Sequence, residues 1–380
     1  MQILSKESMS APSSRDSQTL LVQVYFDKTL YNEDYIAEFK ELALSARFFV
    51  ERIIEIHRKA PNARYFIGSG KAEEIAVAVK SCHARQVLIN HTLSPSQKRN
   101  LEQLFACKVM DRTELILHIF ALRARTFEGK LQVELAQLQY MSTQLVRGWA
   151  HLERQKGGIG LRGGPGETQL EVDRRLLRQR IKIIQQRLEK VRKQRNLGRR
   201  SRQFADIPTV SLIGYTNTGK STLFNRLTHA QTYVANQLFA TLDPTLRRIS
   251  FPQAGTIILA DTVGFIRDLP HDLVNAFHAT LEETIAATLL LHVVDAYQAE
   301  RQHYMEEVQK VLKTIGADKQ PQLQVFNKID LLENQEPRID RDAKGLPIRV
   351  WISAHTGAGL PLLHQALGEL LNMPVTTIQK

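Results

Sequence analysis

The sequence predicts an α/β protein in three parts: an N-terminal α/β domain, an antiparallel helical hairpin as linker, and a doubly wound C-terminal domain. Strand-like and helix-like runs alternate between residues 20 and 122, which is typical of an α/β domain. Apolar residues recur at heptad spacing between residues 123 and 205, which predicts paired helices. From residue 206 onward, short apolar runs are followed by helices or polar motifs, which predicts a largely parallel sheet.

Length and composition place the chain among globular proteins. Its 380 residues are enough for two or three domains, and 43% of them are hydrophobic. Only Cys82 and Cys107 are present, which favours a reducing compartment and no disulfide framework. Residues 1–19 are polar without an apolar signal segment, and we expect a disordered tail there. The longest apolar stretch, Ala286–Ala296, is too short to cross a bilayer, so we expect a cytoplasmic protein with no membrane span. We also expect a monomer.

The first predicted domain, residues 20–122, alternates strands and helices. The predicted strands are Leu20–Phe26, Phe48–Ile56, Gln86–Asn90 and Cys107–Met110. The predicted helices are Tyr31–Leu44, Lys71–Val79, Ser94–Phe105 and Thr113–Leu122. Ser94 before Pro95 is a good N-cap, and Thr113 is the expected cap of the last helix. The order of elements predicts a largely parallel sheet.

The middle segment, residues 123–205, carries two mostly apolar runs at 4-3-4-3 spacing. They are Leu131, Leu135, Leu138, Ser142 and Leu145, and then Leu177, Ile181, Ile184, Leu188 and Val191. Two such helices predict an antiparallel hairpin, with the loop 156–166 at its tip. Six of the eleven residues in this loop are glycine, which permits close backbone approach to a phosphate-rich surface. A flexible connector is the alternative.

The chain's net charge of +12 is concentrated in the hairpin. Residues 147–202 hold 17 Lys and Arg against five Asp and Glu, so this segment alone has a net charge of +12. Such a concentration indicates a polyanionic partner, and a solvated helix face is the alternative. The candidate RNA-binding residues are Arg154, Lys156, Arg162, Arg174 and Arg175.

The C-terminal domain is predicted over residues 206–372, with a tail at 373–380. Its predicted strands are Thr209–Ile213, Thr256–Ala260, Leu289–Asp295, Gln322–Phe326 and Arg349–Ile352, with Leu246–Phe251 as the one antiparallel strand. Motifs follow several of these strands. Because the carboxyl ends of parallel strands meet at one edge of a sheet, we expect the motifs to form a single ligand site there.

The first motif, Gly214–Ser221, matches a phosphate loop. Its glycines let backbone N–H groups surround a β-phosphate, Lys220 reaches the β- and γ-phosphate oxygens, and Ser221 ligates Mg²⁺. The nucleotide-binding residues expected from it are Gly214, Tyr215, Thr216, Asn217, Thr218, Gly219, Lys220, Ser221 and Thr222.

Three later motifs restrict the nucleotide to GTP. Asp261 follows an apolar strand, where a carboxylate can hold Mg²⁺ through water, and the N–H of Gly264 can face the γ-phosphate. Asn327, Lys328 and Asp330 form the base-selecting motif, because one carboxylate can accept both donors of guanine. The fourth motif is Ser353-Ala354. In this order, the four motifs predict a P-loop GTPase domain.

Two positions bear on the mechanism of hydrolysis. Phe265 directly follows Gly264, where Ras-like enzymes carry a glutamine that orients the attacking water. Hydrolysis by the free protein should therefore be slow. Asn217 is the fourth residue of the phosphate loop, where similar enzymes use an asparagine as a K⁺ ligand; a role in stabilising the loop is the alternative.

These motifs make the chain resemble the HflX family, GTPases related to translation factors. The resemblance covers nearly everything after residue 20. It rests on Gly157–Glu171 with Asp173–Arg175, on Gln237–Thr245 and on Asp261–Arg267. Within the second segment, Thr241 is an expected Mg²⁺ ligand and, with Lys220 and Gly264, an expected catalytic residue. The pair Gly163-Gly164 looks like an insertion of one glycine at the tip relative to the family pattern.

The resemblance implies a set of partners and a role. The expected partners are GTP and GDP, Mg²⁺ and K⁺ as cofactors, and the large ribosomal subunit with its RNA, also within the whole ribosome. The expected role is splitting or rescue of stalled and idle ribosomes under stress, with the linker entering the peptidyl-transferase region. A ribosome-assembly checkpoint and a hibernation or anti-association factor stay open as alternatives.

Overall fold

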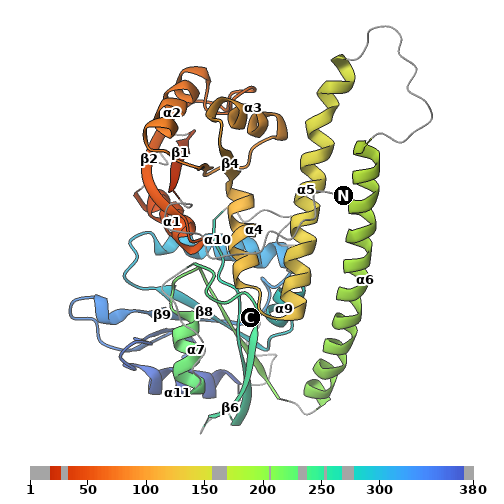
Figure 1. Ribbon diagram of the computed structural model, residues 1–380. Coiled ribbons are helices and arrows are strands. Elements are labelled where there is room, and N and C mark those ends of the chain that lie inside the picture. The colour runs from red at the N-terminus through yellow and green to blue at the C-terminus, as the bar shows by residue number, and fades with distance from the viewer. Residues whose placement is uncertain are drawn as a thin grey trace. The chain divides into compact units, whose positions relative to one another are not determined.

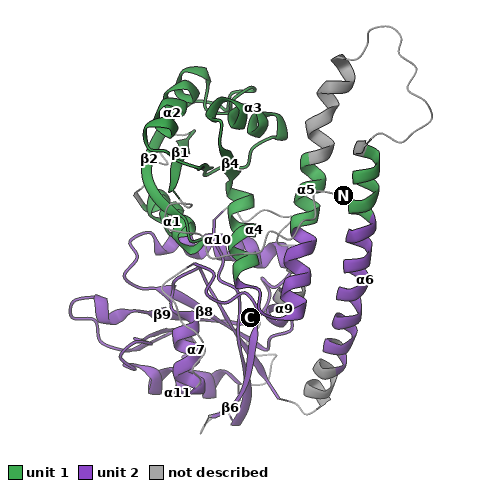
Figure 2. Cartoon of the chain, in the orientation of Figure 1, with its two compact units in different colours: residues 1–122, 137–178 green, residues 123–136, 179–380 purple. Residues whose placement is uncertain are grey.

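The computed structural model describes residues 18–26, 33–155, 169–204, 207–229, 238–251, 255–267 and 278–371 (Figure 1). The chain divides into two compact units, coloured in Figure 2. One comprises residues 1–122 and 137–178, and the other comprises residues 123–136 and 179–380. Both units therefore include part of the helical segment 123–205, and the domain limits given above stay predictions.

The first unit contains a four-stranded parallel sheet in the order β2-β1-β3-β4. Its strands are β1 (Gln18–Tyr25), β2 (Phe49–His57), β3 (Gln86–Ile89) and β4 (Lys108–Asp111). The helices that alternate with them are α1 (Glu33–Ser45), α2 (Ser69–Ser81), α3 (Pro95–Phe105) and α4 (Arg112–Arg123). The predicted parallel α/β pattern is confirmed, and β1 begins two residues before the expected boundary at residue 20. The core lies between the sheet and helices such as α2, where Ile75 is fully buried.

The two predicted helix caps of this unit differ in outcome. Ser94 caps α3 with a full capping box, since its side chain accepts from the N–H of Gln97 and the Gln97 side chain accepts from the N–H of Ser94. The prediction that Thr113 caps α4 was wrong. Asp111, at the end of β4, accepts from the N–H of Glu114 at 2.8 Å and takes that place. An aspartate at the end of a strand can also cap the helix that follows, which the apolar run of β4 did not show.

Two long helices, α5 (Phe127–Gln155) and α6 (Gln169–Phe204), fill the middle segment. Within the second unit, Arg180 of α6 pairs with Glu134 of α5, and Arg195 pairs with Glu128. The residue numbers rise along α6 as they fall along α5, so these parts of the helices are antiparallel, as predicted. Ile184, from the second heptad run, is fully buried.

The second unit contains a seven-stranded sheet in the order β10-β11-β9-β8-β5-β7-β6. The strands are β5 (Thr209–Ile213), β6 (Thr245–Phe251), β7 (Gly255–Asp261), β8 (Leu289–Asp295), β9 (Gln322–Asn327), β10 (Ile339–Arg341) and β11 (Pro347–Trp351). The helices are α7 (Lys220–Thr228), α9 (His278–Ile285), α10 (Arg301–Ile315), α11 (Leu360–Leu371) and the 3₁₀ turn η2 (Ile329–Leu331).

The direction of the strands agrees with the prediction except at one edge. β5, β7, β8, β9 and β11 are parallel, and β6 runs antiparallel to β7 as expected. The prediction of a single antiparallel strand was wrong, because β10 also runs antiparallel, to β11. Only three residues long and containing Asp340 and Arg341, β10 has no apolar run to mark it. No described helix has both the length and the apolar content for crossing a membrane.

Candidate functional site

Two glycines shape the loop between β5 and α7. Gly219 has φ +92°, and a Cβ there would lie 2.2 Å from the side-chain nitrogen of Asn327. Gly214 has φ +143°, and a Cβ there would lie 2.3 Å from the carbonyl oxygen of Val293. Any larger residue would therefore push the loop away from β8 and β9. The glycines of the motif are needed for this close approach.

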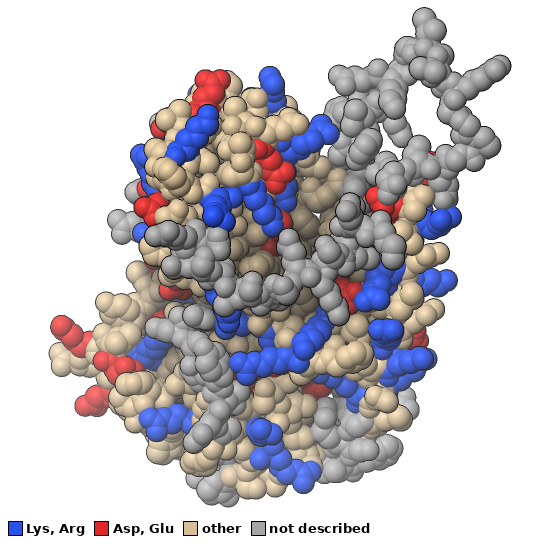
Figure 3. Space-filling model, in the orientation of Figure 1, with Lys and Arg blue, Asp and Glu red and all other residues tan. Residues whose placement is uncertain are grey.

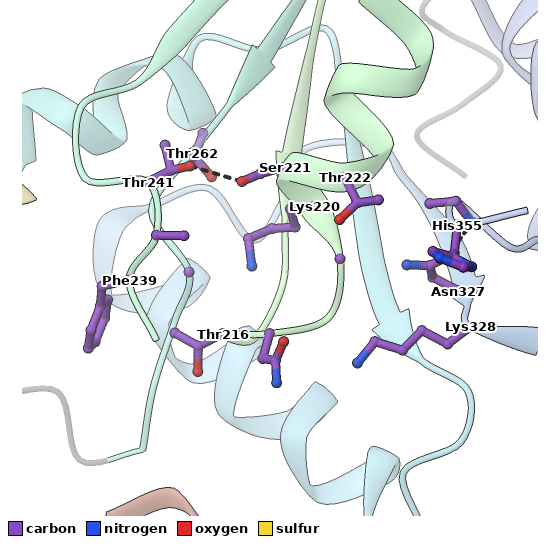
Figure 4. Close-up of a pocket in the computed structure, with 15 residues that line it drawn as sticks. Thr216, Lys220, Ser221, Thr222, Phe239, Thr241, Thr262, Asn327, Lys328 and His355 are labelled. Atoms are coloured by element: carbon purple, nitrogen blue, oxygen red, sulfur yellow. Dashed lines mark hydrogen bonds between the residues drawn. The ribbon is translucent and has the colours of Figure 1, made fainter. Parts of the chain in front are cut away.

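The loop borders a cavity of about 330 Å³, a size typical of small-molecule sites (Figure 4). The predicted nucleotide-binding residues that line it are Thr216, Asn217, Gly219, Lys220, Ser221, Thr222, Thr241, Gly264, Asn327, Lys328 and Ala354. Four residues that were not predicted as site residues complete the lining: Phe239, Ala240, Thr262 and His355. Ala240, Thr262 and His355 each directly adjoin a predicted site residue, and Phe239 lies within Gln237–Thr245, so position in the chain was the available signal. The other predicted residues, Gly214, Tyr215, Thr218, Asp261, Asp330 and Ser353, do not line the cavity.

Lys220, the first residue of α7, provides a buried positive charge. The Lys220 residue is buried, and its Nζ donates to the carbonyl oxygen of Tyr215 at 2.5 Å. Burial lowers the pKa of Lys220 to about 8, while the carboxylate of Asp261 acts in the opposite direction. An approaching phosphate would stabilise the charged form, and the N-terminus of α7 adds backbone N–H donors at the same place. This corner of the cavity is suited to an anion.

Three oxygen-bearing side chains converge beside Lys220. The hydroxyls of Ser221 and Thr241 lie 2.9 Å apart (Figure 4). Both also donate to Oδ2 of Asp261, at 2.8 and 2.9 Å. Asp261 is fully buried, and burial raises the pKa of its carboxyl group against the hydrogen bonds that lower it. Its Oδ1 has no hydrogen-bond partner among the described residues. The three side chains therefore offer oxygen donors of the kind that Mg²⁺ prefers.

The donor set also indicates how such a metal would be held. The described residues contain no cluster of three or more His, Cys, Asp or Glu that could hold a metal ion. Two hydroxyls and one carboxylate fit a Mg²⁺ that takes its remaining ligands from water and from nucleotide phosphates. Bound there, the ion would neutralise charge on the phosphates, while Lys220 would neutralise more of it from the other side.

The segment after Asp261 is joined to the phosphate loop through its backbone. The N–H of Phe265 donates to the carbonyl oxygen of Gly214 at 3.1 Å, and the N–H of Thr216 donates to that of Phe265 at 2.8 Å. The Phe265 side chain is buried, only 2% exposed, and does not line the cavity. At Gly264, a Cβ would lie 2.9 Å from the Thr216 side chain and 3.1 Å from Nζ of Lys220. A glycine there keeps the phosphate corner open.

The base-selecting motif lies on the side of the cavity opposite Thr241 (Figure 4). Asn327 connects two loops: its Nδ2 donates to the carbonyl oxygen of Thr218 at 2.9 Å, and its Oδ1 accepts from the N–H of Ala354 at 2.8 Å. Lys328 has φ +69° and pairs with Asp295 at 2.7 Å. Asp330 is exposed, in η2. The structure thus gives Asn327 a supporting role, and the choice of base by Asp330 stays a prediction.

The predicted RNA-binding residues are less fully described. Lys156 and Arg162 lie outside the described residues, and for Arg154 the structure describes only the helical backbone of α5. Arg174 and Arg175 lie in the first turns of α6, half-buried and exposed respectively.

Three family models match successive parts of the chain. One described as GTP-binding GTPase N-terminal matches residues 33–121, one described as GTP-binding GTPase Middle Region matches residues 123–202, and one described as 50S ribosome-binding GTPase matches residues 209–328. Together they cover most of the chain, including the phosphate loop, the Asp261–Gly264 motif and Asn327-Lys328, but not Asp330 or Ser353-Ala354.

Individual relatives cover most of the chain as well. GTPase HflX of Escherichia coli (strain K12) is 63% identical over 355 residues, which are 93% of this chain and 83% of that protein. GTPase HflX of Magnetococcus marinus is 53% identical over 309 residues, 81% of this chain and 71% of that protein. A crystal structure of SsGBP with GDP matches with a TM-score of 0.51 and 25% identity, over 96% of this chain and 100% of that one.

The geometry and these likenesses agree on the activity. An anion-binding corner, a set of oxygen donors suited to Mg²⁺ and a guanine-type motif surround one cavity, and the similar proteins are GTPases. The chain binds GTP and GDP and hydrolyses GTP. By its identity to these relatives over most of its length, this chain belongs to the HflX family of GTPases.

Proposed function

We propose that this GTPase binds the large ribosomal subunit through its basic hairpin and splits or rescues stalled and idle ribosomes under stress, in the cytoplasm. The ribosome would then stimulate GTP hydrolysis. The description 50S ribosome-binding GTPase, carried by the family model over residues 209–328, supports this partner.

The observation that carries the proposal is the charge on α6. The exposed basic residues between residues 171 and 195 are Arg175, Arg178, Arg180, Lys182, Arg187, Lys190, Arg192 and Lys193. Figure 3 shows Lys and Arg side chains gathered along this part of the chain, on the right of the view. A rod with so much exposed positive charge suits RNA, because each phosphate that it neutralises releases counterions. Arg154, Lys156, Arg162 and Arg174 would extend this surface to the tip.

The residue Phe265 supports the proposed stimulation by the ribosome. With its side chain buried, position 265 offers no amide to orient a water, so Lys220, Thr241 and the N–H of Gly264 would act on the phosphates without that help. A group supplied by the partner can raise such a rate by several orders of magnitude. We therefore expect slow turnover by the free protein and fast turnover on large subunits.

A sucrose gradient tests the role. Whole ribosomes are incubated with the protein and GTP, a non-hydrolysable GTP analogue, GDP or ATP, and the sedimenting species are measured. Splitting predicts that whole ribosomes become separate subunits with GTP or the analogue, with the protein on the large one. If whole ribosomes stay intact while the protein sediments with large subunits, splitting is wrong and the assembly or hibernation role takes its place. If the protein stays at the top of the gradient, the ribosomal partner itself is wrong.

Asn217 is the proposed ligand of a K⁺ ion. It lines the cavity, and its backbone lies in the left-handed region with φ +63°. Ribosome-stimulated hydrolysis should be faster in K⁺ than in Na⁺ at equal ionic strength, and Asn217→Ala should remove the difference. Equal rates in both salts for the unchanged protein would leave Asn217 with a role in the loop only.

A further inference from the structure

Asp243 joins the magnesium site to the hairpin. It lies two residues after Thr241, in the segment that leads from the cavity to β6. Its Oδ2 accepts from the backbone N–H groups of Arg125 and Thr126, each at 2.9 Å. Its Oδ1 accepts from the hydroxyl of Thr126. A single carboxylate thus receives three hydrogen bonds from the residues directly before α5.

The contact completes the N-terminal cap of α5. Oγ1 of Thr126 accepts from the N–H of Gly129 at 2.9 Å, as an N-cap side chain does. In a capping box, the third helical residue supplies a Glu or Gln that accepts the N–H of the cap residue. Here that third residue is Gly129, which has no side chain, and Asp243 supplies the carboxylate from far away in the sequence.

Gly129 provides the space for this carboxylate. A Cβ at Gly129 would lie 2.1 Å from Oδ1 of Asp243. Glycine inside a helix costs about 1 kcal/mol relative to alanine. A buried glycine in the first turn of α5 is therefore explained by the carboxylate that it admits.

The capped turn is also connected to α6 and to α9. Glu128, next to Gly129, pairs with Arg195 of α6 at 3.0 Å, and Arg192 of α6 pairs with Glu282 of α9 at 2.6 Å. Along the chain, α9 is the first described helix after the Asp261–Gly264 motif. Both segments that would contact the γ-phosphate and its metal therefore lead to the base of the hairpin. All these residues belong to the second compact unit (Figure 2).

We propose that Asp243 is a positioning residue that couples Thr241 to α5. When GTP and Mg²⁺ hold Thr241 beside Ser221 and Asp261, Asp243 is kept at the N-terminus of α5. When GDP replaces GTP, Thr241 no longer ligates the metal and Asp243 is released, so the first turn of α5 loses its external cap. Because such coupling is reciprocal, the capped helix must in turn favour GTP over GDP. This inference rests on the proposed role of Thr241 as a metal ligand.

The test measures nucleotide preference in the full chain without ribosomes. The affinities for a non-hydrolysable GTP analogue and for GDP are measured with Mg²⁺ by titration with fluorescent nucleotides. For Asp243→Ala we expect the affinity for the analogue to fall by about 5-fold or more, the lower end of typical coupling. The affinity for GDP should stay within about twofold, since Asp243 itself does not line the cavity. The affinity of Asp243→Asn for the analogue should lie between those of wild type and Asp243→Ala, because the amide oxygen of asparagine can still accept one of the hydrogen bonds.

A pair of glycine variants separates this coupling from simple helix stability. Gly129→Ala should lower the preference for the analogue, because the new methyl group displaces the carboxylate of Asp243. Gly70→Ala is the matched control: it lies in the first turn of α2, where a Cβ would meet nothing within 4 Å. That variant should leave the preference unchanged. An equal preference in Gly129→Ala and wild type would overturn the proposal.

Two further measurements keep the outcomes distinct. Hydrogen exchange of residues 126–132 should be slower with the analogue than with GDP in wild type, and equal in both for Asp243→Ala; no nucleotide dependence in wild type contradicts the coupling. If Asp243→Ala does not fold, Thr126→Val, which exchanges the hydroxyl for a methyl group, replaces it. Thr241→Ala reports on the metal site. If Thr241→Ala loses the preference for the GTP analogue over GDP while Asp243→Ala keeps it, the coupling through Asp243 is wrong and the metal-ligand role of Thr241 stands. If Thr241→Ala keeps the preference, both the coupling and the metal-ligand role are wrong.

Discussion

The exposed carboxylate of Asp330 carries the prediction on base choice. In Asp330→Asn, an amide replaces the acceptor that would receive both guanine donors, and it can donate to the 2-oxo group of xanthine. We expect the affinity for GTP to fall by about tenfold or more, the equivalent of about 1.4 kcal/mol, with a gain for XTP. Competition of GTP, XTP and ATP against a fluorescent nucleotide measures this. Asp318→Asn, an exposed aspartate remote from the cavity lining, is the control and should keep GTP preference. An unchanged preference in Asp330→Asn would remove the base-selecting role.

The residue Phe265 leads to a prediction that differs from what analogy with Ras-like GTPases would suggest for the rate of GTP hydrolysis. Restoring the Ras-like glutamine, Phe265→Gln, should not speed hydrolysis by the free protein, because this side chain is buried while its backbone bonds to Gly214 and Thr216. Burying an amide without partners should instead lower stability by about 1–3 kcal/mol. Single-turnover hydrolysis and thermal unfolding check both points, with Phe265→Leu as the apolar control. A tenfold faster free enzyme would mean that position 265 reaches the γ-phosphate.

At this scale the sequence predicted residue types better than residue contacts. The four motifs were enough to predict ten residues of the cavity lining, because phosphate and guanine chemistry demands particular groups at fixed spacing, and the family resemblance added Thr241. The bridging role of Asn327 between Thr218 and Ala354 could not be predicted, since it depends on how closely three loops approach. The external cap from Asp243 to Thr126 was beyond prediction for the same reason.

Strand β8 contains a histidine that should make stability depend on pH. His292 is buried, and burial, with Lys220 adding to the effect, lowers its pKa from 6.5 to about 4. Between these two values the unfolded chain binds a proton that the folded chain does not. The stabilisation is therefore complete above pH 6.5 and is lost as the pH falls toward 4, by up to about 1.4 kcal/mol for each pH unit.

Urea unfolding of the wild type and of His292→Leu checks this linkage. Carboxyl groups also titrate in acid, so the difference between the two proteins is the informative quantity. From about pH 7 down to about pH 5, wild type should lose more stability than the variant. Parallel curves for the two proteins would show that His292 is not held neutral in the folded state.

For whole elements, prediction succeeded where a buried periodic pattern is long. All strands of the two sheets except β10 were expected from the sequence, and the two heptad repeats predicted α5 and α6. The short edge strand β10 was missed, since its Asp340 and Arg341 give no apolar signal. The cap of α4 was assigned to Thr113 in place of Asp111, because ends of elements are set by single hydrogen bonds that a pattern does not show.

For the molecule as a whole, the prediction concerns salt and the ribosome. Replacing Arg154, Lys156 and Arg162 together with Ala should weaken ribosome binding and ribosome-stimulated hydrolysis, and leave GTP affinity unchanged. The slope of log affinity against log salt should become shallower by roughly 0.7 to 0.9 for each RNA phosphate that the variant no longer neutralises. Sedimentation with ribosomes at several salt concentrations measures it.

The control removes equal charge elsewhere. Lys313, Lys319 and Lys344 are exposed on the second unit outside the hairpin, and their replacement with Ala should leave the slope nearly unchanged. Wild-type binding by the tip variant at physiological salt would make the glycine loop a connector. The N-terminal domain would then be the leading candidate for binding the ribosome.

The division of α5 between the two compact units limits how this chain can be truncated into fragments that keep their contacts. The catalytic module is not contiguous in sequence: residues 123–136 belong to it, although more than forty residues of other structure separate them from residue 179. A fragment cut at residue 206 would strip Asp243 of its three donors and Glu282 of Arg192. The shortest contiguous segment of the chain that keeps these partners starts near residue 123 and includes the whole hairpin. Exchange of modules between relatives, in evolution or in the laboratory, must therefore carry the hairpin along with the enzyme.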